Sequence, residues 1–166
     1  QGKKGIIFME KYSLGEAAMN NFHFSNETEK KYALACLEFA KIIGLIDDSS
    51  LDAVEKRCKA ENEKRRIQTE NGETDYGLVE FPLSVNLDYE LTRIKLDFAS
   101  EKKEINYSFA PISKKEKKEF YKNNTDLFTR YGGDKFRFKE VDMIVAKKIR
   151  EEQFENEIKN ILHKFD

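Results

Sequence analysis

Few side chains in this sequence have the types and spacing that catalysis requires. Its two histidines, His23 and His163, stand at opposite ends of the chain, and neither belongs to a His-Glu-x-x-His spacing that would bind zinc. The sequence has no Gly-x-Ser-x-Gly elbow and no glycine-rich phosphate loop. No carboxylate stands alone in an apolar run, where burial would raise its pKa. We therefore expect no catalytic residues, no metal ligands and no cofactor.

The two cysteines, Cys36 and Cys58, are too few for a four-cysteine zinc site and do not form a Cys-x-x-Cys pair. Each falls on an apolar position of an expected helix, where a free thiol behaves as a small hydrophobic side chain. A nucleophilic Cys–His pair is disfavoured because a reactive cysteine needs an electropositive, partly exposed setting. We expect two buried structural thiols, although the sequence does not exclude a disulfide between them.

Aromatic residues are the remaining candidates for a binding function. The chain has 13 phenylalanines and seven tyrosines but no tryptophan. Most must fill the core, but Tyr76, Phe81, Tyr89 and Tyr107 lie near expected loops, where they would line a groove. Exposed apolar patches usually mark interaction sites. Tyr76, Phe81 and Tyr89 are the predicted contacts for a bound polypeptide, and burial in the core is the alternative for each.

Composition narrows the class of protein and the kind of partner. Charged residues make up 37% of the 166 positions, and 30 basic side chains nearly balance 31 acidic ones. A net charge of −1 provides no overall field for nucleic acid, so we expect no nucleic-acid partner. No apolar run approaches the roughly 20 residues that span a bilayer. The length fits a single domain over 1–166.

The apolar periodicity predicts a mostly helical chain with a small β element. Clean alternation of Ile105, Tyr107 and Phe109 predicts a short strand. Asn26 and Ser113 are placed to cap helices, the second within a Ser-x-x-Glu capping box. The last helix should span the molecule and close the core against the earlier helices. Helices are expected at 13–21, 26–43, 51–69, 84–98, 113–124 and 139–165, with further short strands at 5–9 and 136–138.

Four stretches of the chain occur in a familiar order. They are the strand and capped helix of 5–21, the run Glu61–Arg66 followed by Asp75–Leu78 and Phe81, the segment Ile112–Phe128, and the closing stretch Phe138–Phe154. In this order they resemble the helical chaperone domain of secreted SurA/PrsA-type foldases, which include parvulin-type peptidyl-prolyl isomerases. In that family the isomerase domain is inserted between the last two stretches. Only about ten residues, Thr129–Arg137, stand there, too few for a domain.

The resemblance implies a SurA-like chaperone module without its isomerase, in which the long C-terminal helix packs on the N-terminal helices. It also implies export, as a membrane-tethered lipoprotein of a Gram-positive bacterium whose leader is absent from this sequence. The function it favours is non-catalytic, chaperone-like binding of extended or unfolded polypeptide outside the cytoplasm, driven by roughly 25 cal/mol per Å² of covered apolar area. Two alternatives stay open: an assembly module that forms a homodimer or a partner complex, and a degenerate peptidyl-prolyl isomerase.

Overall fold

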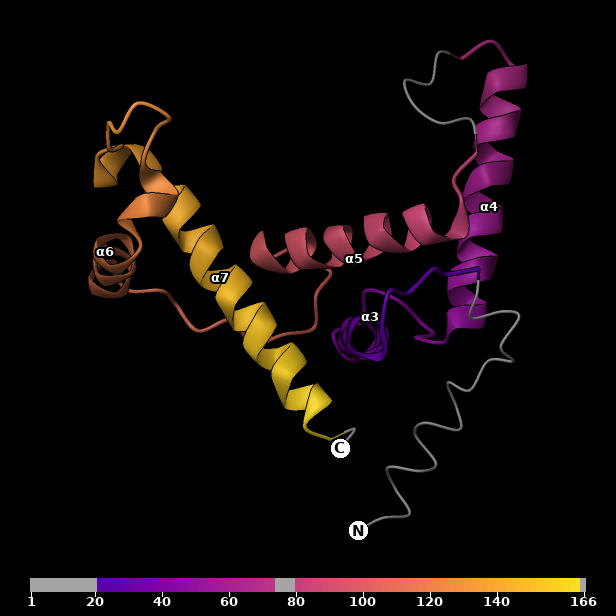
Figure 1. The fold of residues 1–166 in the computed structure, drawn as a ribbon, viewed down its shortest axis with the longest axis horizontal. Coiled ribbons are helices and arrows are strands. Elements are labelled where there is room, and N and C mark those ends of the chain that lie inside the picture. The colour runs from indigo at the N-terminus through magenta and orange to yellow at the C-terminus, as the bar shows by residue number, and fades with distance from the viewer. Residues whose placement is uncertain (1–20, 74–79, 165–166) are drawn as a thin grey trace.

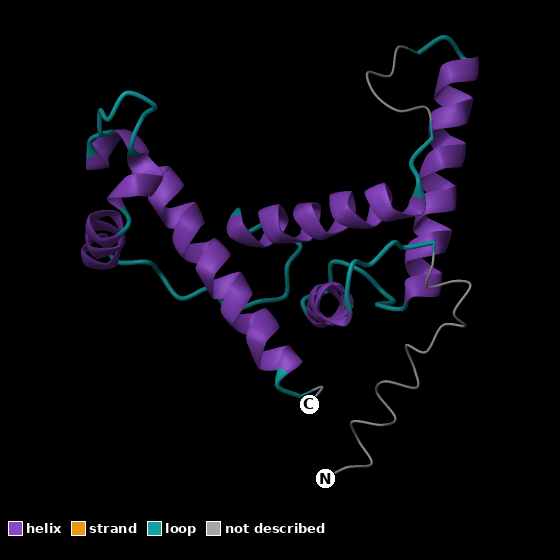
Figure 2. Ribbon diagram, viewed as in Figure 1, coloured by secondary structure: helices purple, strands orange, loops and turns teal. Residues whose placement is uncertain are grey.

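The computed structural model of this protein describes residues 21–73 and 80–164 (Figure 1). Within these ranges the chain consists of helices and loops, with no strand (Figure 2). A single isolated antiparallel bridge joins Thr129 to Lys135. The elements are α3 (Glu27–Ile42), α4 (Leu51–Glu70), α5 (Leu83–Ala99), α6 (Lys114–Asn123), the short 3₁₀ helix η1 (Thr125–Phe128) and α7 (Phe138–Leu162).

Local capping signals determine where several helices begin and end. The Asn26 side chain accepts a hydrogen bond from the Glu29 amide at 2.8 Å, so α3 starts where the sequence predicts. Ser113 and Glu116 form the predicted capping box of α6. Gly44 follows α3 with a φ of 78°, a conformation that glycine adopts without strain.

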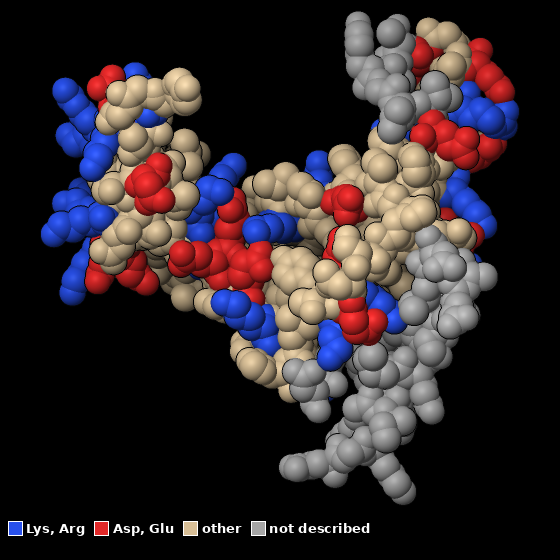
Figure 3. All heavy atoms as spheres, in the orientation of Figure 1, with Lys and Arg blue, Asp and Glu red and all other residues tan. Residues whose placement is uncertain are grey.

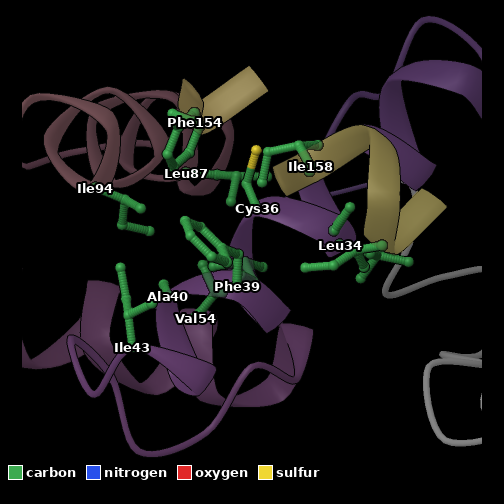
Figure 4. Close-up of a cluster of buried hydrophobic side chains, with 14 of the residues drawn as sticks. Leu34, Cys36, Phe39, Ala40, Ile43, Val54, Leu87, Ile94, Phe154 and Ile158 are labelled. Carbon is green, nitrogen blue, oxygen red and sulfur yellow. The ribbon is translucent and has the colours of Figure 1, made fainter. Parts of the chain in front are cut away.

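The main core forms where α3 packs against α5 and α7 (Figure 4). Phe39 of α3, Phe98 of α5 and Phe154 of α7 meet there, with ring centroids 5.5–5.7 Å apart. The expected packing of a long C-terminal helix on the N-terminal helices is confirmed. A second, smaller cluster around Phe128, Val141 and Val145 holds α6 and η1 against the N-terminal half of α7.

Helix α4 is, after α6, the most polar helix of the described chain. Its buried residues are Leu51, Val54 and Cys58, all in its N-terminal half. Arg66 pairs with Glu63 and Glu70 on the solvated C-terminal half. Most of this helix is therefore solvated, and only a narrow stripe of it packs against the rest of the molecule.

The strand predicted over 105–109 is wrong. This segment is extended but pairs with no other strand within the described residues, and one backbone hydrogen bond joins the Asn106 amide to the Ile43 carbonyl at 2.9 Å. Its alternation has a different cause, because Ile105 and the rings of Tyr107 and Phe109 pack on the main core. The strand predicted over 136–138 is also absent, since Phe138 begins α7.

Two of the predicted elements fall almost entirely on residues that the structure does not describe. The strand expected at 5–9 and the helix expected at 13–21 lie outside the described residues, except for Asn21. No helix in the ranges 21–73 and 80–164 combines the length and the apolar character needed to cross a bilayer.

Both cysteines are buried and unpaired, as the sequence predicts. Burial raises the pKa of Cys36 to about 12. The folded state therefore holds this proton more tightly than the unfolded chain, whose thiol ionises near pH 8.5. Its contribution to stability is complete below that pH and is lost as the pH rises toward 12.

We expect the free energy of unfolding to fall between pH 8 and 10 by up to about 1.4 kcal/mol per pH unit from Cys36 alone. Urea denaturation across this range checks the slope. The free energy of unfolding of Cys36→Ala should fall less steeply with pH than that of the parent protein, whatever the variant's absolute stability. Equal slopes for the two proteins would show that this thiol ionises equally in both states.

Candidate functional site

The described helices form a U. Helix α5 is its floor, the C-terminal half of α4 forms one arm, and α6, η1 and the N-terminal half of α7 form the other (Figure 1). The space-filling view shows the molecule hollowed between the two arms, above a largely tan floor (Figure 3). We call the surface between the arms the concave face. Helix α3 packs on the other side of α5.

Helix α5 carries apolar residues on two opposite sides. Leu87, Ile94 and Phe98 face the core. A second apolar stripe lies on the side turned away from those residues, with steps of four and then seven positions. It consists of Val85, Tyr89 and Leu96, which are 40%, 60% and 52% exposed. Because α3 and α7 cover the buried side, this second stripe faces the space between the arms. Exposed apolar side chains in register are typical of a contact surface.

Helix α7 continues the same surface. Met143 lies at helical spacing before Arg150 and Phe154, on the face that the C-terminal half of the helix buries in the core. In the N-terminal half this face has no covering element among the described residues, and Met143 is 78% exposed. A helix face that is buried along part of its length and open along the rest leaves room for another polypeptide.

Two of the three predicted binding residues lie together at one end of the floor. The rings of Phe81 and Tyr89 stack with centroids 6.3 Å apart and planes 15° apart. Tyr76 lies outside the described residues. Tyr107 does not line a groove, because it packs on Phe98 at 5.0 Å and donates its hydroxyl to Glu157.

Side chains of α4 hold Phe81 in place. The Asn62 amide donates to the Phe81 carbonyl at 3.0 Å and accepts from the Phe81 amide at 2.8 Å. The Arg65 guanidinium lies 4.3 Å from the Phe81 ring centroid. The Asn62-x-x-Arg65 spacing and the distant Phe81, noted in the sequence as a family motif, are therefore one structural clamp.

A cavity of about 340 Å³ opens beside this aromatic pair, between α4, α5 and the α3–α4 loop. Glu90 Oε1 lies 2.7 Å from Arg57 Nη2, but the two groups are not aligned for a hydrogen bond, so their attraction is ionic. Arg93 pairs with Asp97 at 3.1 Å. Glu61, the third acidic residue of the lining, pairs with Arg65.

Asn86 is a residue that the sequence analysis missed. It lines this cavity from α5 and is only 7% exposed. Its side-chain amide is not among the buried polar groups that lack a hydrogen-bond partner in the described chain, which are the Arg57 Nε and Nη2 atoms and the Glu90 Oε1 atom. The only sequence signal was its place four residues before Glu90 on one helix face, which by itself does not distinguish a site from a solvated surface.

The described residues hold no group of three or more histidine, cysteine, aspartate or glutamate side chains that would bind a metal. Over residues 21–73 and 80–164, two carboxyls have a clearly shifted pKa, and both shifts are downward: Glu63 beside Arg66, and Glu116 through the hydroxyl of Ser113. A catalytic general acid needs the opposite, a carboxyl that keeps its proton.

The chain is similar to two solved structures of one enzyme, the native protein and its selenomethionine derivative. The native and selenomethionine structures of a GH136 lacto-N-biosidase from Eubacterium ramulus each match with a TM-score of 0.66 and 26% sequence identity. The match covers 81% of this chain and 28% of the other, so this chain spans about a quarter of its neighbour's length. No protein-family model matches the sequence, and no curated protein does.

This finding corrects the resemblance drawn from the sequence. The described fold is similar to part of a glycoside hydrolase, not to a SurA/PrsA-type foldase. The chaperone and peptidyl-prolyl isomerase assignments that came with that resemblance are therefore wrong. The four stretches misled because each is a degenerate helix pattern, which unrelated helical domains share.

Proposed function

We propose that this protein is a non-catalytic accessory module that docks, through its concave face, on the catalytic part of a glycoside hydrolase. The observation that carries the proposal is the match to just over a quarter of a lacto-N-biosidase chain. The match leaves most of the enzyme's chain outside the shared region. A polypeptide that corresponds to this larger part would be the partner on which the module docks.

The surface supports docking better than hydrolysis. A glycosidase needs two carboxyl groups facing one another across a cleft, one of them protonated. The concave face instead presents Val85, Tyr89, Leu96 and Met143. The carboxylates in the nearby cavity are paired with arginines. Apolar side chains in register stabilise a protein interface by roughly 25 cal/mol per Å² covered.

A chimera tests this proposal. This chain replaces the matched segment of the Eubacterium ramulus lacto-N-biosidase, and hydrolysis of that enzyme's substrate is measured. We expect an active chimera, because the two segments share a fold. Leu96→Asp and Met143→Asp should each lower its activity or its yield at least tenfold, since an unpaired charge buried at an interface costs several kcal/mol.

Ile42→Asp is the matched control. Ile42 is as exposed as the interface residues, at 58%, but it lies on α3, on the other side of α5. It should leave the chimera active. An inactive parent chimera, or equal losses from all three aspartates, would contradict docking through the concave face.

Two other uses of the same apolar surface stay predictions: binding of an extended polypeptide, and pairing of two copies of this chain. Light scattering of the isolated protein distinguishes the second, because a homodimer would double the mass as concentration rises and Met143→Asp would reverse it. The location outside the cytoplasm also stays a prediction.

A further inference from the structure

We propose that the outer side of the arm that contains α6 binds an anionic lipid surface. Residues 111–139 carry nine basic and four acidic side chains, a net charge of +5, although the whole chain carries −1. Lysine and arginine side chains gather along the outer edge of this arm, on the side turned away from the hollow (Figure 3). The inference goes beyond docking on a hydrolase and stands without it, because this side stays open when a partner covers the concave face.

Four lysines of α6 lie within an arc of about 100° around the helix axis. This lysine face consists of Lys114, Lys115, Lys118 and Lys122. All four side chains are exposed, and none has an ion-pair partner within the described residues. Lys117 lies on another side of the helix and is spent on Asp142 of α7, at 2.9 Å.

The lysine face does not stabilise the fold. Lys114 and Lys115 occupy the first turn of α6, where the helix dipole disfavours cations. Lys118 and Lys122 continue from Lys114 at steps of four, so like charges stand one turn apart and repel one another. The helix is held to α7 by its aromatic side chains instead. The lysine face is therefore free for a partner, and its charge requires that partner to be anionic.

Two apolar side chains of the same arm favour a lipid surface over a soluble polyanion. Leu127 of η1 is 55% exposed, and Tyr131, in the loop that leads to α7, is fully exposed. Tyrosine is enriched at membrane interfaces, where its ring lies at the level of the headgroups. Lysine is a point charge on a flexible stem, which suits a diffuse layer of headgroups, whereas fixed bidentate recognition uses arginine.

Vesicle co-sedimentation of the isolated protein measures this binding. At about 0.1 M NaCl, we expect partition onto phosphatidylcholine vesicles with about 30% phosphatidylglycerol to exceed partition onto pure phosphatidylcholine by about tenfold or more. Raising NaCl to about 1 M shortens the Debye length from about 10 Å to about 3 Å and should remove the difference.

The double variant Lys118→Glu with Lys122→Glu should lower binding to the anionic vesicles about tenfold or more, since each basic residue near such a surface contributes a factor of about five. Lys56→Glu with Lys64→Glu is the matched control. Both of these lysines are exposed on α4, on the far side of the concave face, and the change in net charge is the same. The control should bind as the parent protein does, and Tyr131→Ser should weaken binding several-fold through loss of the interfacial ring.

Equal binding to the two kinds of vesicle, or equal losses from the two double variants, would overturn the inference. Polyphosphate and a single-stranded DNA oligonucleotide, tested at the same salt, provide the remaining comparison. Binding to either of them without binding to the anionic vesicles would assign the lysine face to a soluble polyanion and refute the lipid surface. Because the vesicle assay uses the isolated protein, failure of the hydrolase chimera leaves its result unaffected.

Discussion

Phe98→Ala is expected to lower the free energy of unfolding by about 3–5 kcal/mol. Phe98 is fully buried and contacts rings from three other segments, Phe39 of α3, Phe154 of α7 and Phe109 of the extended linker. Truncation loses the transfer free energy of the ring and leaves a cavity that rigid helices cannot close. Against a usual total of about 5–15 kcal/mol, this is a large share.

Urea denaturation followed by circular dichroism measures this loss. If Phe98→Ala does not fold, Phe98→Leu gives a graded result, with an expected loss of about 1 kcal/mol. Tyr131→Ala is the control, because Tyr131 is fully exposed and its removal should change the free energy of unfolding by less than about 0.5 kcal/mol. A Phe98→Ala protein as stable as the control would refute the packing of α3, α5 and α7 around this ring.

Arg150→Met is expected to cost about 2–3 kcal/mol, the second-largest effect. Arg150 is only 5% exposed, and it fastens the α5–α6 linker to α7. Its Nε donates to Glu101 and its Nη2 to the Ala110 carbonyl, both at 2.6 Å, while its Nη1 donates to Gln153 at 2.8 Å. Methionine fills similar space but leaves these acceptors without a donor. Glu101 is 47% exposed and recovers some hydration, which keeps the cost below that of a fully buried pair.

Arg66→Met provides the comparison. Arg66 also contacts two carboxylates, Glu63 and Glu70, but it is 55% exposed. Exposed ion pairs contribute little, so the urea midpoint of Arg66→Met should match that of the parent protein. The urea midpoint of Arg150→Lys should lie between those of Arg150→Met and Arg66→Met, because lysine keeps the charge but not the several donors of the guanidinium. Equal midpoints for Arg150→Met and Arg66→Met would show that the linker is not held by this guanidinium.

Local chemistry made most helices predictable. Asn26 and Ser113 cap the helices they were expected to cap, and Gly44 ends α3 in the left-handed conformation. These signals act between residues three or four positions apart, so they survive without knowledge of the fold. The apolar period of α7 likewise predicted a long helix that closes the core.

Signals that depend on distant partners failed. Ile105, Tyr107 and Phe109 alternate because one side of an extended segment packs on helices, and the same alternation predicts a strand. The alternation alone does not reveal whether a second strand lies beside the segment to pair with it. The family assignment failed for a related reason, since Asn62, Arg65 and Phe81 form a clamp that any α4–α5 packing of this geometry would favour.

The concave face was only partly visible in the sequence. Val85, Leu87, Tyr89 and Leu91 alternate, which obscured the two opposite apolar stripes that helix α5 carries. Phe81 and Tyr89 were predicted to bind, but that they stack on one another follows from the α4–α5 packing. Asn86 could not be singled out, because its burial beside this cavity exists only in the folded molecule.

Hydroxyl-radical footprinting tests docking through the concave face most directly, because it reports side-chain exposure residue by residue. Met143 and Leu96, exposed in the isolated protein, should be oxidised several-fold more slowly within the hydrolase chimera, while Ile42 on α3 should react equally in both. Unchanged oxidation of Met143 and Leu96 in an active chimera, or protection of Ile42 instead, would contradict the account.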